Sequence, residues 1–327
     1  SGAASVARAL RNARMICISE QESSDLITPQ LAFDAVRQAF VDAISGAVAF
    51  PSVIAHGSEP SNRMSIKSAA GLAIGGLKIG SYWPGNAALG LPRHNSTIIL
   101  LDQSNGRVEA VIEAAKVNAW RTAAADAVAA SVLARPDSRV LAIFGSGHQA
   151  EYECAALCAL LPIDKVFVVA RSSDKAIDLA GRLSARGIAA SPGTARAACE
   201  AADIVVTATA SREPLFEAEW VRPGTHVASM GSDAAGKQEL PPALARRGRC
   251  FCDLPAQSVV MGEFQHVADD IASGAVALTP IGAVLDGRAA GRSARDEITI
   301  FDSSGIALQD LYVGRAILDK ARASSPR

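Results

Sequence analysis

The chain has 327 residues, of which 49% are hydrophobic and 20% charged, enough apolar material for two domains with sizeable cores. Its 32 Lys and Arg balance 33 Asp and Glu, and the net charge of −1 gives no reason to expect nucleic acid or a membrane as a partner. Six cysteines form no CxxC pair or metal-binding spacing, and no apolar run reaches the roughly 18 residues of a membrane span. We therefore expect a cytoplasmic protein without a bound metal, beginning with a flexible stretch over residues 1–14.

The first part of the chain combines helices with short strands. Residues 29–46 are typical of a helix, because Thr28 can cap its start, Pro29 suits its first turn and apolar residues recur at helical spacing. From about 50 to 114, runs such as "LKIGSYW" and "STIILLD" predict strands, and the Asn-Gly turn in "DQSNGR" is of the kind that joins antiparallel strands. Residues 115–134 are Ala-rich and helical.

Beyond residue 138 the pattern becomes strand, glycine turn, helix, and it repeats. Continuous apolar runs such as "RVLAIFG", "KVFVVA" and "ADIVVTATA" alternate with amphipathic segments, which predicts a parallel sheet covered on both faces. The tail, from "DEITIFD" onwards, adds one strand and a long helix. The expected fold class is therefore α/β, with a doubly wound parallel sheet in one domain and an antiparallel sheet in a second, α+β domain.

A glycine-rich turn follows the strand "VLAIF". Gly145, Gly147 and Ala150 form the G-x-G-x-x-G/A arrangement, in which the first glycine makes a tight turn and the second lets a pyrophosphate approach the backbone. The helix that follows would offer free N–H groups to the phosphates. The alternative is a tight structural turn, but the strand before it and the strand and helix after it favour a dinucleotide site.

The end of the next strand, "VVARSSDK", bears on the choice of dinucleotide. An acidic residue there would bind the ribose hydroxyl of NAD, but Ala170 occupies that position. Arg171, Ser172 and Ser173 follow, and an arginine at this point can accept the 2′-phosphate of NADP. A solvated surface arginine is the other interpretation. We expect NADP(H) to be favoured over NAD.

Several longer segments can be compared with known families: "GLKIGSYWPGN", "LPRHNSTIILLDQSNG", "AWRTAAADAVAA", "FGSGHQAE", "VTATASREPL", "MGSDAAGKQEL" and "DEITIFDSSGIALQD". In these segments, and in their order over roughly residues 15–322, the chain resembles the ornithine cyclodeaminase/mu-crystallin family. The resemblance implies a homodimer whose subunit has an NAD(P)-binding Rossmann domain, here 131–304. It also implies a substrate-binding and dimerisation domain, here 1–130 with 305–327.

The resemblance also assigns roles to individual residues. It makes Asp233 the acid/base carboxylate, Lys78 a catalytic lysine facing the substrate, and Arg121 a contact of both the substrate carboxylate and the cofactor. Ser304 joins the substrate-binding residues. The remaining cofactor contacts, together with the glycine loop and the Arg171–Ser172 pair, are Thr97, His148, Gln149, Thr209, Met230, Gly231, Ser232, Lys237 and Ser303.

These assignments are chemically reasonable, and each has a structural alternative. Arginine offers a two-pronged donor for a carboxylate, and reduction of C=N needs a proton donor at nitrogen as hydride reaches carbon. Asp233 could instead cap a helix, Lys78 could reach the surface from an apolar strand, and Arg121 could be an ordinary helix residue.

The chain departs from the family in the segment "FPSVIAHG". Other members place an arginine after the proline, where it helps to hold the substrate carboxylate, and none is present here. Lys67, in "RMSIKSA", or Arg63 is a candidate for binding a distal acid group, because similar sequences with such a lysine include iminosuccinate reductases. The other interpretation of Lys67 is a solvated strand residue.

The sequence therefore predicts an NAD(P)H-dependent oxidoreductase. It would reduce an α-imino acid of the ketimine or iminosuccinate type to an amino acid, or run the reverse dehydrogenation. One alternative is a cyclodeaminase-type lyase that releases ammonia and recycles NAD. Another is a non-enzymatic, mu-crystallin-like NADP-binding protein, against which the presence of Lys78, Arg121 and Asp233 argues. The sequence does not identify the imino acid.

Overall fold

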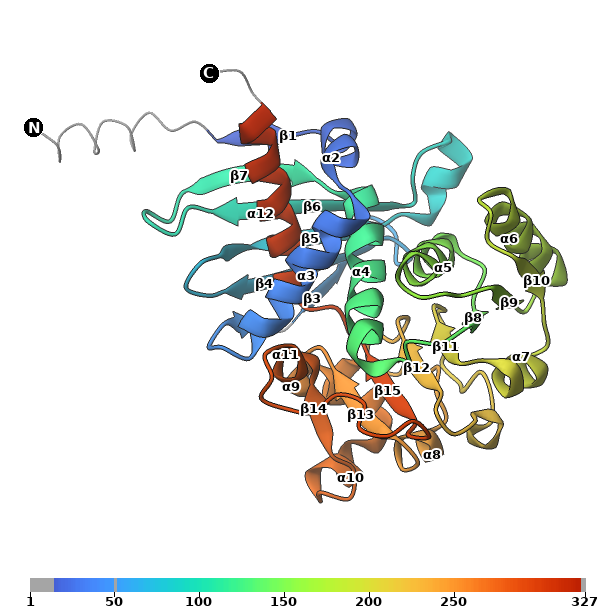
Figure 1. Cartoon of the computed structure of the whole chain (residues 1–327). Coiled ribbons are helices and arrows are strands. Elements are labelled where there is room, and N and C mark those ends of the chain that lie inside the picture. Colours follow the sequence, from blue (N-terminus) through green and yellow to red (C-terminus); the bar gives the residue numbers. More distant parts are fainter. Residues whose placement is uncertain (1–14, 50–51, 325–327) are drawn as a thin grey trace, which may run out of the picture. The chain divides into compact units, whose positions relative to one another are not determined.

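The computed structural model describes residues 15–49 and 52–324 (Figure 1), so the expected flexible start lies outside the described residues. The chain divides into two compact units, and each is described by itself. The first unit takes its described residues from Ser1–Ile27, Ala47–Asn118 and Asp310–Arg327, and the second from Thr28–Gly46 and Ala119–Gln309.

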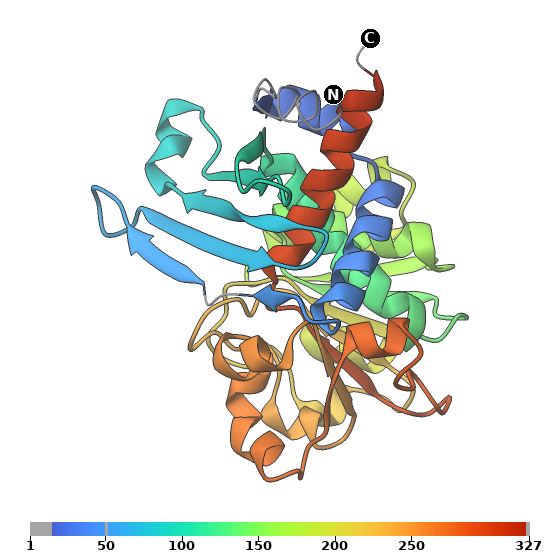
Figure 2. The ribbon, with the colours of Figure 1, turned by 90° about the vertical axis from the view of Figure 1, so that its left-hand side faces the viewer.

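The first unit is built on a mixed sheet in which antiparallel pairs predominate. Its strand order is β1-β7-β6-β5-β4-β2, with β3 paired to β4, and only β1 with β7 is parallel among these described strands. The long strands β4 and β5 lie next to each other (light blue in Figure 2). The elements are β1 (Ile16–Ile18), α2 (Glu20–Leu26), β2 (Val48–Ala49), β3 (Val53–His56), β4 (Arg63–Ala70), β5 (Gly75–Tyr82), η1 (Pro84–Leu89), β6 (His94–Leu101) and β7 (Val108–Glu113).

The C-terminal helix α12 (Ala307–Ser324) covers one face of this sheet over its Asp310–Ser324 part (Figure 1). Gly314 allows the close approach, because a Cβ there would lie 3.0 Å from a methyl group of the fully buried Ile98. Arg315 donates a 3.0 Å hydrogen bond to Glu109 of β7, which fixes the helix along the sheet. The Asn-Gly turn joins β6 to the antiparallel β7 as predicted, with Gly106 at φ 74°.

The second unit contains an eight-stranded sheet in the order β10-β9-β8-β11-β12-β15-β13-β14, parallel throughout. The predicted α/β class, with a parallel sheet and a separate antiparallel one, is confirmed. The strands are β8 (Val140–Phe144), β9 (Lys165–Val169), β10 (Ala190–Pro192), β11 (Ile204–Thr207), β12 (His226–Ser229), β13 (Arg249–Cys252), β14 (Leu278–Pro280) and β15 (Thr299–Asp302).

Most helices of the second unit alternate with these strands because the strands are apolar on both faces and need cover on each. The helices are α3 (Pro29–Ala43), α4 (Ala115–Leu133, which belongs to this unit from Ala119 onwards), α5 (His148–Leu160), α6 (Ser173–Ala185), α7 (Ala195–Ala201), η2 (Ala218–Trp220), α8 (Pro242–Ala245), α9 (Pro255–Met261), η3 (Glu263–Val267), α10 (Ala268–Ala272) and α11 (Ile281–Leu285). No helix in the described part of the chain is both long and apolar enough to cross a membrane.

Helix α3 belongs to the parallel-sheet unit, although it precedes the antiparallel strands in the sequence. Thr28 caps it and Pro29 begins it, as the sequence indicated. Its apolar face packs on α11, where Gly282 lies so close to the Phe40 carbonyl that a Cβ would be 2.0 Å from that oxygen. Phe40 also meets Phe301 of β15 edge to face at 6.2 Å. The two compact units meet at residues 118/119 and 309/310, and α3 is an additional part of the second unit.

Candidate active site

The second unit has a cleft of about 800 Å³ at the carboxyl ends of its first strands. Strand β8 lies between β9 and β11. The chain passes from β8 through β9 to β10 on one side of β8, and it then crosses to β11 on the other side. Such a change of direction leaves a crevice in which ligands of open α/β sheets bind. The cleft is lined by the residues that follow β8, β9 and β11: Phe144, Gly145, Ser146, Gly147, Val169, Ala170, Arg171, Ser172, Lys175, Ala208, Thr209, Ala210, Ser211 and Leu215.

The glycine loop has the form needed to hold a pyrophosphate. Gly145 has φ 122°, and a Cβ there would lie 2.6 Å from the Ala208 carbonyl oxygen, so no other residue fits without rearrangement. Gly147 is the N-cap of α5 and makes no side-chain capping bond, and a Cβ on it would meet no protein atom within 4 Å. The N-terminus of this 13-residue helix therefore presents uncapped N–H groups, which favour an anionic phosphate.

The segment after β9 carries two cations at the edge of the same cleft. Arg171 and Lys175 are both exposed and both line the cleft. Ser172 caps α6, its hydroxyl accepting a 3.4 Å hydrogen bond from the Lys175 backbone N–H. Arg171 and Ser172 were predicted from the sequence, whereas Lys175 was not. Lys175 could have been found from its spacing. It lies four residues after Arg171, and a helix capped at Ser172 brings residues with this spacing to the same side.

Asp233 lies in the loop after β12, and it does not cap a helix in the described part of the chain. The next helix, α8, begins at Pro242 with Pro241 as its N-cap, so Asp233 caps no described helix. Its carboxylate lies 2.5 Å from the Lys237 ammonium, which also donates a 3.0 Å hydrogen bond to the Gly231 carbonyl. The Asp233 side chain is 49% exposed. This loop therefore presents an accessible ion pair at the carboxyl edge of the sheet.

The other predicted cofactor residues of this unit lie in three settings. Thr209 is in the cleft wall. The His148 ring is exposed and contacts the Tyr152 ring at 4.8 Å, whereas the Gln149 amide turns inwards and donates to the Ala119 carbonyl and to Glu153. Met230, Ser232 and Ser303 are buried.

Arg121 is buried in the second unit, where it donates a 3.0 Å hydrogen bond to Gln309. Two fully buried acids, Asp126 and Glu153, lie near it and share an interaction. Burial raises the pKa of both carboxyls, so the pair retains a proton where isolated acids would lose it. This pair was not predicted from the sequence, because an acid within an Ala-rich helix carries no sign of burial.

Ser304, a predicted substrate contact, is fully buried in the second unit. Its hydroxyl donates to the Asp253 carboxylate at 2.9 Å and accepts from the Gln257 amide at 2.9 Å. These bonds hold the start of the segment that leads into α12.

In the first unit, Lys78 is almost fully buried on β5. Its ammonium donates a 2.6 Å hydrogen bond to Asn118 and lies 3.5 Å from the Asp310 carboxylate. Lys67 of β4 is its direct cross-strand partner, so both lysines lie on one face of the sheet. Thr97 pairs with Ile79, the neighbour of Lys78, and therefore lies on the other face.

Among the residues that the structure describes, no group of three or more His, Cys, Asp or Glu could hold a metal ion. The predicted site residues thus fall in a cleft with a glycine loop and a nearby ion pair in the second unit, and in a pair of lysines in the first.

Comparison with known proteins agrees with this geometry. The family model described as the ornithine cyclodeaminase/mu-crystallin family matches residues 14–325. Iminosuccinate reductase of Paracoccus denitrificans is 37% identical over 322 residues, which cover 94% of this chain and 97% of that protein. The structure of that enzyme in complex with NAD⁺ superposes with a TM-score of 0.87 at 36% identity, covering 94% of this chain and 97% of the other.

Two further solved structures are similar. An archaeal alanine dehydrogenase dimer with bound NAD has a TM-score of 0.87 at 32% identity, covering 94% of this chain and 96% of that one. The Δ1-pyrroline-2-carboxylate reductase of Thermococcus litoralis, in complex with NADH and L-proline, has a TM-score of 0.86 at 27% identity, covering 94% and 98%. These relatives are oxidoreductases of imino or amino acids, and the structures were solved with NAD⁺, NAD or NADH. The predicted enzyme class, with cyclodeaminase as its alternative, is therefore confirmed. The chain belongs to the ornithine cyclodeaminase/mu-crystallin family.

Proposed function

We propose that this protein reduces an α-imino acid to the amino acid with NADPH, and that its substrate is a dicarboxylate of the iminosuccinate type. The observation that carries the reaction class is the 800 Å³ cleft, whose glycine loop and uncapped helix N-terminus suit a dinucleotide. The relatives named as reductases of imino acids support the same reaction. A bound nicotinamide dinucleotide supplies or accepts the hydride.

The substrate class rests on the cross-strand pair Lys67–Lys78. Two like charges directly opposite each other on antiparallel strands destabilise a sheet unless an anion compensates them. The Asp310 carboxylate, 3.5 Å from the Lys78 ammonium, offsets the charge of Lys78. Arg63, four residues before Lys67 on β4, lies on the same face. A substrate with a second carboxylate would satisfy this cationic row, whereas a monocarboxylate would need only one of these groups.

The proton needed at the substrate nitrogen would come from the loop after β12. The Lys237 ammonium donates a 2.5 Å hydrogen bond to the Asp233 carboxylate there, and the carboxylate is accessible. A proton delivered to the substrate nitrogen leaves the pair one proton short, and solvent can replace that proton because the Asp233 side chain is 49% exposed. Arg121 is assigned to the substrate carboxylate and Lys78 to the reacting end of the substrate, in line with the family resemblance.

We further propose that NADPH is favoured over NADH. Arg171 and Lys175 supply two exposed cations that line the cleft. The three relatives were solved with NAD⁺, NAD and NADH, so this preference would separate the chain from them.

Assembly as a homodimer in the cytoplasm completes the proposal. Val48, Val53, Ile54 and Val108 are exposed on strands of the first unit, and apolar side chains of this number on a sheet favour a protein partner. Light scattering at micromolar concentration should give twice the mass of the chain, and a monomeric mass would contradict this part.

The test is spectrophotometric. NADPH oxidation is followed with oxaloacetate plus ammonia, which generates iminosuccinate in solution, and with pyruvate plus ammonia and Δ1-pyrroline-2-carboxylate for comparison. The proposal predicts the highest kcat/KM with the dicarboxylic imine. Higher activity with either monocarboxylic imine would overturn the substrate class, and ammonia release from ornithine without net NADPH oxidation would indicate the cyclodeaminase.

A further inference from the structure

Glu239 is fully buried, yet it is not part of the cleft or of the Asp233–Lys237 pair. Its carboxylate accepts five hydrogen bonds. One oxygen, Oε1, accepts from the backbone N–H and the hydroxyl of Thr209, both at 2.7 Å. The other, Oε2, accepts from Gly231 N–H at 2.9 Å and from the hydroxyls of Thr207 at 2.7 Å and Ser229 at 3.0 Å.

These donors belong to the carboxyl ends of two neighbouring strands. Thr207 and Ser229 are the last residues of β11 and β12, which pair with each other in the sheet. Thr209 lines the cleft, and Gly231 accepts a bond from the Asp233 backbone N–H at 3.2 Å. A carboxylate with five donors is strongly fixed, so it can hold the two segments in one relative position.

The space around Gly231 shows how tightly this junction is packed. A Cβ on Gly231 would lie 2.3 Å from the Thr209 carbonyl oxygen and 2.6 Å from Glu239 Oε1. The loop that carries Asp233 thus touches the cleft wall directly, and the Glu239 carboxylate bridges them on the buried side. Displacing Gly231 by even a fraction of an ångström would move the base of the Asp233 turn.

We propose that Glu239 is a positioning residue for the reaction: its buried carboxylate fixes Gly231 against Thr209 and so sets the position of Asp233 relative to the cleft. The inference rests on the proposed function, because Asp233 acts there as the acid/base group. Glu239 itself touches neither the cleft nor Asp233.

Glu239→Gln is the discriminating substitution, because it keeps size and burial but changes the count of acceptors. The two backbone donors, Thr209 N–H and Gly231 N–H, approach different carboxylate oxygens and cannot reverse their direction. Glutamine has one carbonyl oxygen, so its NH₂ group must face one of these N–H groups. One of the two backbone bonds is therefore lost in either amide orientation.

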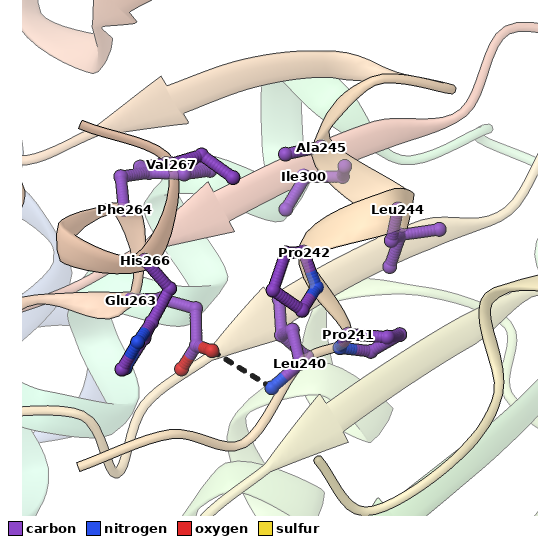
Figure 3. A pocket seen from close by; sticks show the side chains of 10 residues that line it. All are labelled: Leu240, Pro241, Pro242, Leu244, Ala245, Glu263, Phe264, His266, Val267 and Ile300. Atoms are coloured by element: carbon purple, nitrogen blue, oxygen red, sulfur yellow. Dashed lines mark hydrogen bonds between the residues drawn. The ribbon is translucent and has the colours of Figure 1, made fainter. Parts of the chain in front are cut away.

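Glu263 offers a matched control in the same network. Figure 3 shows its carboxylate directed at the Leu240 backbone nitrogen, which it contacts at 2.8 Å. Glu239 N–H donates to both oxygens of this carboxylate, at 3.2 Å to Oε1 and 3.0 Å to Oε2, and Oε2 also accepts from the Ser229 hydroxyl at 3.2 Å. In Glu263→Gln, a carbonyl oxygen at the Oε1 position still accepts from Leu240 N–H and from Glu239 N–H, which loses only its second bond to Oε2, and the NH₂ can donate to the Ser229 oxygen. The cavity beside these residues has only about 10 Å³, room for about one water.

The experiment has two arms. Hydrogen–deuterium exchange is measured for peptides covering 204–215 and 226–240. In E239Q, exchange of at least one of these peptides should be at least tenfold faster than in wild type, whereas in E263Q both should stay within threefold of wild type. Steady-state reduction of the imino acid should show kcat at least tenfold lower in E239Q with KM changed less than threefold, because the substrate-binding side chains are untouched. E263Q should keep kcat within threefold.

Unchanged exchange in E239Q overturns the inference, whatever the activity of the wild type. Faster exchange with unchanged kcat also overturns it, because the carboxylate would then be structural only. A wild type that reduces no imino acid contradicts the proposed function instead, and the exchange arm still decides whether Glu239 holds the loop.

If E239Q does not fold, the double variant Thr207→Val with Ser229→Ala replaces it. This variant removes two of the three bonds to Oε2 and leaves both backbone bonds possible. Exchange at 226–240 should quicken at least threefold and kcat should fall by a similar factor. Wild-type values in both measurements overturn the inference.

Discussion

Replacing Arg171 and Lys175 by alanine should abolish the preference for NADPH. Both cations are exposed and line the cleft beside Ser172, and neither belongs to an ion pair within the described part of the chain. Because they are uncommitted, no protein bond has to break before they bind the additional phosphate of NADPH, and their removal leaves no buried charge behind.

The size of the effect follows from their exposure. A charge-assisted hydrogen bond contributes roughly 1.5–3 kcal/mol, and solvent screening at an exposed site favours the lower end. One such contact at about 1.5 kcal/mol corresponds to roughly a tenfold change in Kd, and two contacts to about a hundredfold at most. The double variant should therefore bind NADPH about 10–100-fold more weakly, and NADH within twofold of wild type.

Fluorescence titration of each dinucleotide at two salt concentrations measures this directly. The NADPH affinity of the wild type should weaken more with salt than that of the double variant, because phosphate contacts are screened. Arg196→Ala is the control, since this exposed arginine pairs with Glu200 on α7 and does not line the cleft. Equal wild-type affinities for NADPH and NADH, or equal losses of both in the variant, would refute the reasoning.

Three further predictions follow from the site and its surroundings. Asp233→Asn should lower kcat by about 10²–10⁴ with Tm and dinucleotide affinity nearly unchanged, because it removes a proton donor that caps no helix; turnover within threefold of wild type would count against it. Lys67→Met should lower kcat/KM at least tenfold for a dicarboxylic imine and less than threefold for a monocarboxylic one, and equal losses would show that Lys67 does not read the second carboxylate. Burial raises the pKa of Glu263 from 4.5 to about 7, so the folded protein holds this proton more tightly than the unfolded chain does. The free energy of unfolding that Glu263 contributes is therefore fully present below pH 4.5 and is lost as pH rises through 7, a loss of about 3 kcal/mol. Urea unfolding at pH 5 and pH 8 should show that Glu263→Gln escapes most of this loss; the same pH dependence in both proteins would contradict the assignment.

The features that could be predicted from sequence are those written in local patterns. The apolar strands alternate with helices, and the glycine loop follows β8 directly, so the parallel sheet and its cleft were both expected. Thr28 and Pro29 correctly marked the start of α3, because capping depends on neighbouring residues alone.

What the sequence could not provide depends on distant residues. The pairing of Lys67 with Lys78 is set by strand register across a turn, and the packing of α3 on α11 brings together segments about 240 residues apart. Glu239 stands in "GKQELPP", where a charged residue in a loop normally faces water. Only the fold shows that the ends of β11 and β12 surround it with five donors.

The central claim is hydride transfer to an imino acid with net consumption of NADPH. It is tested most directly by the product formed from oxaloacetate, ammonia and NADPH deuterated at the nicotinamide C4, analysed by mass spectrometry. The account predicts one aspartate per NADPH oxidised, with one deuterium on its α-carbon when the transferred position carries the label. Aspartate without deuterium from either C4-labelled form, or turnover that leaves the NADPH concentration unchanged, would contradict it.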